Sequence, residues 1–204
     1  MKVGIAALNS SNYKSIGRAL NWIEIEYIFI KNSKELNKIS HLILPGVSSF
    51  GSVINELIDR DLIGGIEKLK NLGMPILGLC AGMQIMGESS EESPGVAGLK
   101  WFNFKVETII PDFNLGTRSF HTGWNDVYDY SKNSITALPG VFYFNHSFYV
   151  RKLPEDEIYG KTEHGQMFAS IIRKENIIGA QFHPEKSQSK GLEFLENFIK
   201  LKNA

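Results

Sequence analysis

The chain has 204 residues, of which 43% are hydrophobic and 22% charged, and its 22 basic residues balance its 22 acidic ones. This composition is typical of one globular domain over residues 1–204, and a net charge of zero leaves no basic footprint for nucleic acid and no polybasic membrane anchor. The single cysteine, Cys80, cannot form an internal disulfide, and no segment is typical of a signal peptide or a membrane span, so we expect a cytoplasmic protein. The five histidines show no ligand spacing, so we expect no metal and no cofactor.

In the first half of the chain, short apolar segments alternate with amphipathic ones. A helix is predicted over residues 13–22, and apolar residues recur every 3.6 positions over residues 53–69. Continuous apolar strands that alternate with helices indicate a parallel sheet covered on both faces. The predicted strands of this part are residues 3–8, 25–30, 41–44 and 76–79.

After residue 95 the pattern changes to that of antiparallel strands. Residues 101–109 alternate apolar and polar side chains with a period of two, and a helix is predicted over residues 191–201. Further strands are predicted over residues 141–150, 167–173 and 176–182. The chain is therefore predicted to be an α/β protein with a mostly parallel central sheet flanked by helices and an additional antiparallel sheet.

Cys80 lies in the sequence Gly78-Leu79-Cys80-Ala81-Gly82, between a predicted strand and a helix-like run over residues 83–86. A nucleophile in such a sequence occupies a sharp strand-to-helix turn, where the flanking glycines relieve crowding and the helix N-terminus favours the thiolate. A lone cysteine is more often a small buried hydrophobe, so this pattern by itself leaves both interpretations open.

A cysteine nucleophile needs a base, and His183 is the candidate because Glu185 follows it two residues later. In an extended segment the two side chains point the same way, and Pro184 favours that conformation. Residues 44–51, read as LPGVSSFG, follow the third predicted strand and could present backbone N–H groups to an oxyanion on the same sheet edge as Cys80.

Taken together, these segments resemble the class I, triad-type glutamine amidotransferases, and most of all the glutaminase subunits of imidazole-glycerol-phosphate synthases. The resemblance runs in order from about residue 3 to residue 201. It is carried by the segments LPGVSSFG, GLCAGMQIMGESSEES, HTGWNDV, YFNHSFYV and GAQFHPEKS.

The resemblance implies a glutaminase that hydrolyses L-glutamine to glutamate and ammonia through a Cys80 thioester, with His183 as general base and acid and Glu185 orienting it. The oxyanion donors would be the backbone N–H groups of Ala81 and, after a loop adjustment, Val47. By the same resemblance, the substrate would contact Gly46, Gln84, Glu92, His146 and Ser147. Without it, Gln84 would be interpreted as a helix-surface amide and Glu92 as a solvated carboxylate.

The resemblance also implies a partner: a (β/α)8-barrel cyclase of histidine biosynthesis that receives the ammonia through its core in a heterodimer. The docking region would contain His121, Gly123, Trp124, Asn125 and Lys186. From the sequence alone, Trp124 is equally consistent with an interface anchor and with a core residue.

The sequence departs from the family pattern in loops near the partner and the oxyanion donor, while the triad is unchanged. The opening D-Y-G-x-G-N-L keeps only Asn12, Ser48 replaces the last glycine of PGVG, and Asn145 replaces a valine; residues 120–122 read FHT instead of PHM. This pattern is also compatible with a paralogous glutaminase that supplies ammonia for modifying surface-polysaccharide or flagellar sugars.

Two further hypotheses assign the chain to other functional classes. A non-catalytic scaffold would have no need of an intact Cys80, His183 and Glu185 set. A different cysteine hydrolase on a similar turn would leave Gln84 unexplained and would usually carry histidine where Ala81 stands.

Overall fold

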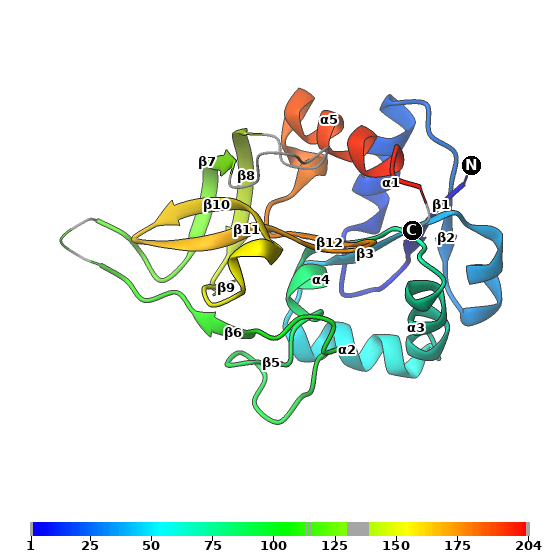
Figure 1. The fold of residues 1–204 in the computed structure, drawn as a ribbon, viewed down its shortest axis with the longest axis horizontal. Helices are drawn as coiled ribbons and strands as arrows, with labels where there is room; N and C mark the ends of the chain where they lie inside the picture. Colours follow the sequence, from blue (N-terminus) through cyan, green and yellow to red (C-terminus); the bar gives the residue numbers. More distant parts are fainter. Residues whose placement is uncertain (1, 113, 115, 130–138, 203–204) are drawn as a thin grey trace.

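The computed structural model describes residues 2–112, 114, 116–129 and 139–202. Its main element is a nine-stranded mixed sheet in the order β2-β1-β3-β4-β12-β11-β10-β7-β8 (Figure 1). The first five of these strands are parallel and the last four continue the sheet antiparallel. The parallel strands are β1 (Val3–Ala6), β2 (Tyr27–Ile30), β3 (His41–Gly46), β4 (Ile76–Cys80) and β12 (Ile177–Ala180). The antiparallel strands are β7 (His121–Asp129), β8 (Gly140–His146), β10 (Ile158–His164) and β11 (Gln166–Lys174).

Helices cover both faces of the parallel half. Helices α1 (Tyr13–Trp22) and α5 (Gln188–Ile199) lie on one face, and α2 (Phe50–Asp59) and α3 (Ile63–Asn71) on the other (Figure 1). Because successive strand residues point to opposite faces, Leu77 and Leu79 join the core under α1 and α5, while Ile76 joins the core under α2 and α3. The short elements are α4 (Ala81–Gln84), η1 (Ser33–Lys38), η2 (Glu155–Glu157) and η3 (Pro184–Lys186).

A second sheet of three strands, β5 (Ser89–Ser90), β6 (Lys105–Thr108) and β9 (Phe148–Val150), lies beside the large one. The predicted α/β fold class, with its additional sheet, is confirmed. The antiparallel strands are divided differently from the expectation, since four of them extend the main sheet. None of the helices in the described part of the chain is long and apolar enough to cross a membrane.

The periodic segment 53–69 forms two helices instead of one. Helix α2 ends at Asp59, and Asp61 adopts a left-handed backbone conformation with φ 52°. The N–H of Leu62 then bonds to the carbonyl oxygen of Leu57 at 3.0 Å, and α3 begins at Ile63. The apolar residues still recur across the break between the two helices, because Leu62 in the connection is also buried.

The strands of the second half differ from the predicted ones in their bounds and number. The segment 101–109 is strand only over Lys105–Thr108, since Trp101 lies in a bend and donates its N–H to the carbonyl oxygen of Met86. The segment 141–150 divides at Ser147 into β8 and β9, which belong to different sheets. Strands β7 and β10 were not predicted, because each mixes polar and apolar residues without a strict alternation.

Candidate active site

Cys80 ends β4 and occupies a strained turn. Its backbone has φ 54° and ψ −114°, a conformation rare for a non-glycine residue. The glycines around it are required by close approach: a Cβ on Gly82 would lie 1.8 Å from the carbonyl oxygen of Leu44, and one on Gly78 would lie 2.4 Å from that of Gly82. The helix that follows, Ala81–Gln84, starts earlier than expected and has only four residues, so its dipole stabilises a thiolate less than that of a longer helix would.

His183 and Glu185 form a buried pair beside this turn. The Nδ1 atom of His183 lies 3.0 Å from Oε1 of Glu185, and the two side chains are 4% and 2% exposed. The predicted contact is present, but its local geometry differs from the expectation, because Pro184–Lys186 is a 3-10 turn and not an extended segment. Two hydrogen bonds fix the backbone of His183. Its N–H donates to the carbonyl oxygen of Tyr143 at 2.8 Å, and its carbonyl oxygen accepts the Ser187 hydroxyl at 2.6 Å.

The electrostatics around His183 favour its charged form. Burial by itself lowers the pKa of this imidazole, but its electrostatic and hydrogen-bond interactions with Cys80 and Glu185 outweigh burial and raise the pKa to about 10. The other ring nitrogen, Nε2, is buried and has no hydrogen bond of normal geometry within the described residues. Catalytic hydrogen bonds are often long or poorly aligned in enzymes without bound substrate.

A pocket of about 540 Å³ opens beside Cys80. This volume lies in the range of small-molecule sites. Its wall contains Val47, Ser48, Ser49, Cys80, Ala81, Gln84, Glu92, Phe120, Thr122, Asn145, His146, Ser147 and Phe148. Most of the residues predicted to contact substrate are therefore brought together. Gly46 instead pairs with Cys80 across β3 and β4 and borders a much smaller hollow that also touches His183 and Glu185.

Gln84 and Glu92 are held by specific contacts in the pocket wall. The Nε2 atom of Gln84 donates to the carbonyl oxygen of Phe148 and to Oε1 of Gln181, both at 2.9 Å. Gln84 is 4% exposed, which excludes its interpretation as a surface amide. Glu92 is half-buried and its Oε2 accepts the N–H of Phe50 at 2.7 Å, at the start of α2.

The two expected oxyanion donors differ in their positions. Ala81 follows the nucleophile at the start of α4. The N–H of Val47 donates to the carbonyl oxygen of Ser10 at 3.1 Å. The Val47 donor is thus occupied in this structure, and its role as an oxyanion donor after a loop adjustment stays a prediction.

A chain of neutral histidines runs from the pocket toward the predicted docking region. His146 contacts the carbonyl oxygen of Phe148 through Nδ1 at 2.8 Å and contacts Nδ1 of His121 through Nε2 at 3.0 Å. The Nε2 atom of His121 accepts the amide of Asn125, also at 3.0 Å. Burial, with the neighbouring histidines, lowers the pKa of His146 to about 3 and that of His121 to about 4. His121 is 4% exposed, so it supports the predicted docking region from behind.

Two side chains of that region, Trp124 and Lys186, both lie beside Tyr143, which was not predicted to belong to it. We call these three residues the docking face. The rings of Trp124 and Tyr143 are edge-to-face with centroids 5.9 Å apart, and Nζ of Lys186 lies 5.4 Å from the Tyr143 ring centroid. Trp124 is 48% exposed, which decides against the core alternative. Gly123, next to it, has φ 135°, a conformation that favours glycine.

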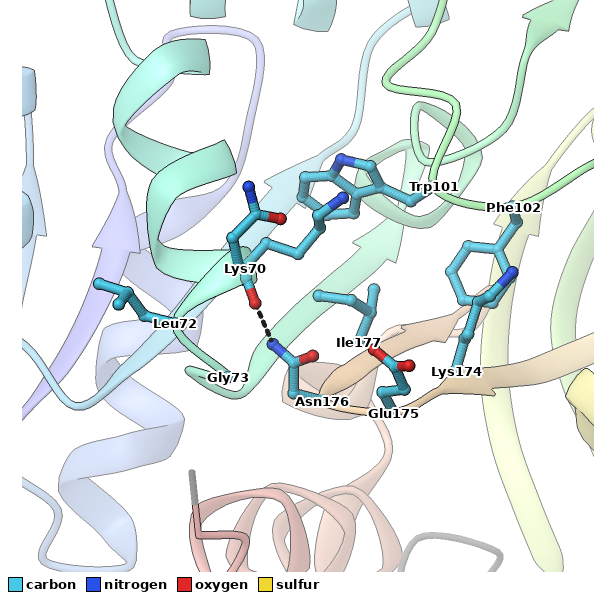
Figure 2. A pocket seen from close by; sticks show the side chains of 10 residues that line it. Lys70, Leu72, Gly73, Trp101, Phe102, Lys174, Glu175, Asn176 and Ile177 are labelled. Carbon is cyan, nitrogen blue, oxygen red and sulfur yellow. Dashed lines mark hydrogen bonds between the residues drawn. The ribbon is translucent and has the colours of Figure 1, made fainter. Parts of the chain in front are cut away.

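A larger hollow, of about 640 Å³, lies at the opposite edge of the sheet, beside the starts of β4 and β12 (Figure 2). Its two lysines are already paired: Lys70 with Glu67 at 3.2 Å and Lys174 with Glu157 at 2.9 Å. The Asn176 amide donates to the Lys70 carbonyl oxygen at 3.1 Å, tying two turns together. The residues that line it include no cysteine, histidine or serine. Size alone therefore does not identify the reactive site.

Four of the departures from the family pattern lie at the pocket near Cys80. Ser48, Phe120, Thr122 and Asn145 all line it. Two of them are paired, since the Thr122 hydroxyl donates to Oδ1 of Asn145 at 3.0 Å.

Comparison with known proteins agrees with this geometry. The family model described as glutamine amidotransferase class-I matches residues 7–201. The chain belongs to the class I glutamine amidotransferases. It is 38% identical to "Imidazole glycerol phosphate synthase subunit HisH" of Methanocaldococcus jannaschii, over 98% of this chain and 99% of that one. It is 34% identical to the Bacillus mycoides protein of the same name, over 96% and 93%. Among solved structures, "Crystal structure of glutamine amidotransferase" superposes with a TM-score of 0.76 at 20% identity, covering 97% of this chain and 98% of that one.

Several residues of this glutamine amidotransferase site were not singled out by the sequence analysis. Gln181 belongs to the segment that carries the resemblance, yet no role was assigned to it. Tyr143 gave no signal beyond its place in a predicted strand. The carbonyl groups of Ser10 and Phe148 belong to the backbone, and a pattern of side chains does not predict which backbone groups form hydrogen bonds.

Proposed function

We propose that this chain is the glutaminase subunit of an imidazole glycerol phosphate synthase. It hydrolyses L-glutamine and passes ammonia to a (β/α)8-barrel cyclase partner in histidine biosynthesis, in the cytoplasm. The observation that carries the proposal is the buried His183–Glu185 pair, 3.0 Å apart, beside a cysteine on a strained turn that opens into a pocket of about 540 Å³. The printed names of the near-full-length relatives support the pathway.

The geometry supports a two-step reaction. Cys80 Sγ attacks the side-chain amide carbon of glutamine, and His183 gives a proton to the departing ammonia, leaving a thioester. Water, deprotonated by His183, then attacks the thioester and releases glutamate and free Cys80. The N–H groups of Ala81 and Val47 would hold the oxyanion in both steps. Glu185 keeps the imidazole oriented and stabilises its positive charge.

The docking face is proposed to receive the partner. Trp124 is an exposed aromatic residue. Lys186 immediately follows Glu185 in the same short turn, so a partner that contacts Lys186 would act on the turn that carries a triad residue. Tryptophan and tyrosine are enriched among the residues that contribute most to binding at protein interfaces.

A glutamine-mimicking chloroketone tests the nucleophile. One label at Cys80 is expected, and Cys80→Ala should abolish both labelling and glutamine hydrolysis. Hydrolysis retained in Cys80→Ala would overturn the assignment.

The pathway needs a separate test. The gene, co-expressed with the cyclase from the same genome, should restore growth without histidine to a strain that lacks this glutaminase. An active glutaminase that fails to restore growth would instead favour the alternative of a paralogue for surface-sugar modification.

A further inference from the structure

The side chain of Gln181 reaches the nucleophile from inside the protein. It directly follows β12, and its backbone N–H bonds to the carbonyl oxygen of Ser170 on β11 at 2.9 Å. Its side chain is completely buried, and its Nε2 lies 3.6 Å from Sγ of Cys80. It is absent from the lining of the pocket, so it faces the sulfur and not the substrate.

The orientation of this amide is decided by a backbone carbonyl. Nε2 of Gln84 faces the carbonyl oxygen of Phe148, which can only accept a hydrogen bond, so the donor end of Gln84 must point there. The second hydrogen of the same nitrogen then donates to Oε1 of Gln181. That leaves Nε2 of Gln181 as the atom that faces Cys80. The two amides therefore form a directional relay in which an N–H is aimed at the sulfur.

The surroundings of Sγ make such a donor useful. The thiol donates to the carbonyl oxygen of Asn145 at 3.8 Å, a contact that favours the neutral form and becomes repulsive once the proton is lost. The helix behind Cys80 has only four residues. A neutral, oriented N–H donor is stronger toward a charged acceptor than toward a neutral one.

We propose that Gln181 is a catalytic residue whose side-chain N–H stabilises the Cys80 thiolate, with Gln84 setting its direction. This inference rests on Cys80 being the nucleophile proposed above. It gives Gln84 a second role beside contact with glutamine.

The test measures the pH dependence of Cys80 alkylation by iodoacetamide, which needs neither glutamine nor a partner. Gln181→Met keeps the volume and removes the donor, and it should raise the apparent midpoint by about one to two pH units. The titratable groups near Cys80 are unchanged in this variant: His183 with its partner Glu185, and His146 and Glu92 in the pocket wall. At pH 7, kcat should fall roughly ten- to a hundredfold, with KM changed little, because the donor acts on the nucleophile.

Asn176→Leu is the matched control, since it removes another buried amide with two hydrogen bonds, at the opposite edge of the sheet. It should lower stability without moving the alkylation midpoint. An unchanged midpoint in Gln181→Met would overturn the proposal while leaving the glutaminase function intact. A shifted midpoint in a chain that hydrolyses no glutamine would support the contact and reject the function.

A measurement on the unaltered chain covers the case in which Gln181→Met does not fold. The side-chain amide protons of Gln181, followed by NMR, should shift with the same midpoint as alkylation. Amide signals that stay unmoved through that titration would contradict the proposal.

Discussion

The N–H of Val47 donates to the carbonyl oxygen of Ser10 at 3.1 Å. This bond joins the loop after β3 to the loop after β1. It occupies the N–H group that we propose as the second oxyanion donor. One missing oxyanion donor lowers kcat by about 10²–10³, so the free chain is expected to hydrolyse glutamine slowly, and docking of the partner should act mainly on kcat.

Ser48→Gly should raise the glutaminase rate of the free chain and reduce the stimulation by the partner. The Val47 N–H belongs to the peptide between Gly46 and Val47, and a glycine at position 48 would give the loop next to this peptide more backbone freedom. We expect a gain of about tenfold, which corresponds to roughly 1.4 kcal/mol. The Ser48 hydroxyl has no hydrogen-bond partner in the described part of the chain, so its loss breaks no such contact. Steady-state assays with and without the partner measure both effects, and full activity of the unmodified free chain would refute the gate.

Glu185→Gln should impair catalysis less than loss of His183. The carboxylate orients the ring through a 3.0 Å contact and contributes to raising its pKa. By analogy with other triads, kcat should fall about 10⁴-fold for Glu185→Gln and about 10⁶-fold for His183→Ala. The Cys80→Ala, His183→Ala double variant should be no slower than either single variant, because triad members act as a unit; additive losses would contradict that.

Acid should destabilise the protein below pH 6.5 through His121 and His146, the two histidines of the buried chain. Burial lowers the folded-state pKa of His146 to about 3 and of His121 to about 4, whereas unfolded histidines titrate near 6.5. The unfolded chain therefore binds more protons between these values, and the stabilisation present above pH 6.5 is lost as pH falls. For His146 the loss is about 2 kcal/mol at pH 5. Urea unfolding at pH 7 and pH 5 measures it. A His146→Gln variant should show a flatter pH dependence, and an equally steep one would count against this cause.

Trp124→Ala should weaken binding of the partner roughly 30-fold, equivalent to about 2 kcal/mol. Its ring is half-exposed and edge-to-face with Tyr143. The matched control is Trp22→Ala, because Trp22 is 81% exposed at the end of α1 and lies outside the docking face. Titration of each variant with the cyclase measures the two affinities. Equal weakening by both substitutions would show that the loss is not specific to the docking face.

The sequence by itself determined the features that depend on near neighbours. Helix α1 spans the predicted residues 13–22, because its apolar face recurs at helical spacing. The turn at Cys80 follows from the glycines beside it, which have no room for a Cβ. The contact between His183 and Glu185 joins residues two positions apart, and so it was visible even though the backbone there is a 3-10 turn.

The tertiary structure alone decided the features that depend on strand order. Gln84 and Gln181 are 97 positions apart and meet only because β12 pairs with β4. Exposure of Trp124 depends on which side of β7 faces solvent, and no alternation in that segment settles it. The Val47 N–H bonds to the carbonyl oxygen of Ser10. Because every residue type has a backbone carbonyl group, no side-chain pattern can predict this bond. Local patterns record side chains at short spacing, whereas donor direction and exposure are set by segments that the fold brings together from far apart in the chain.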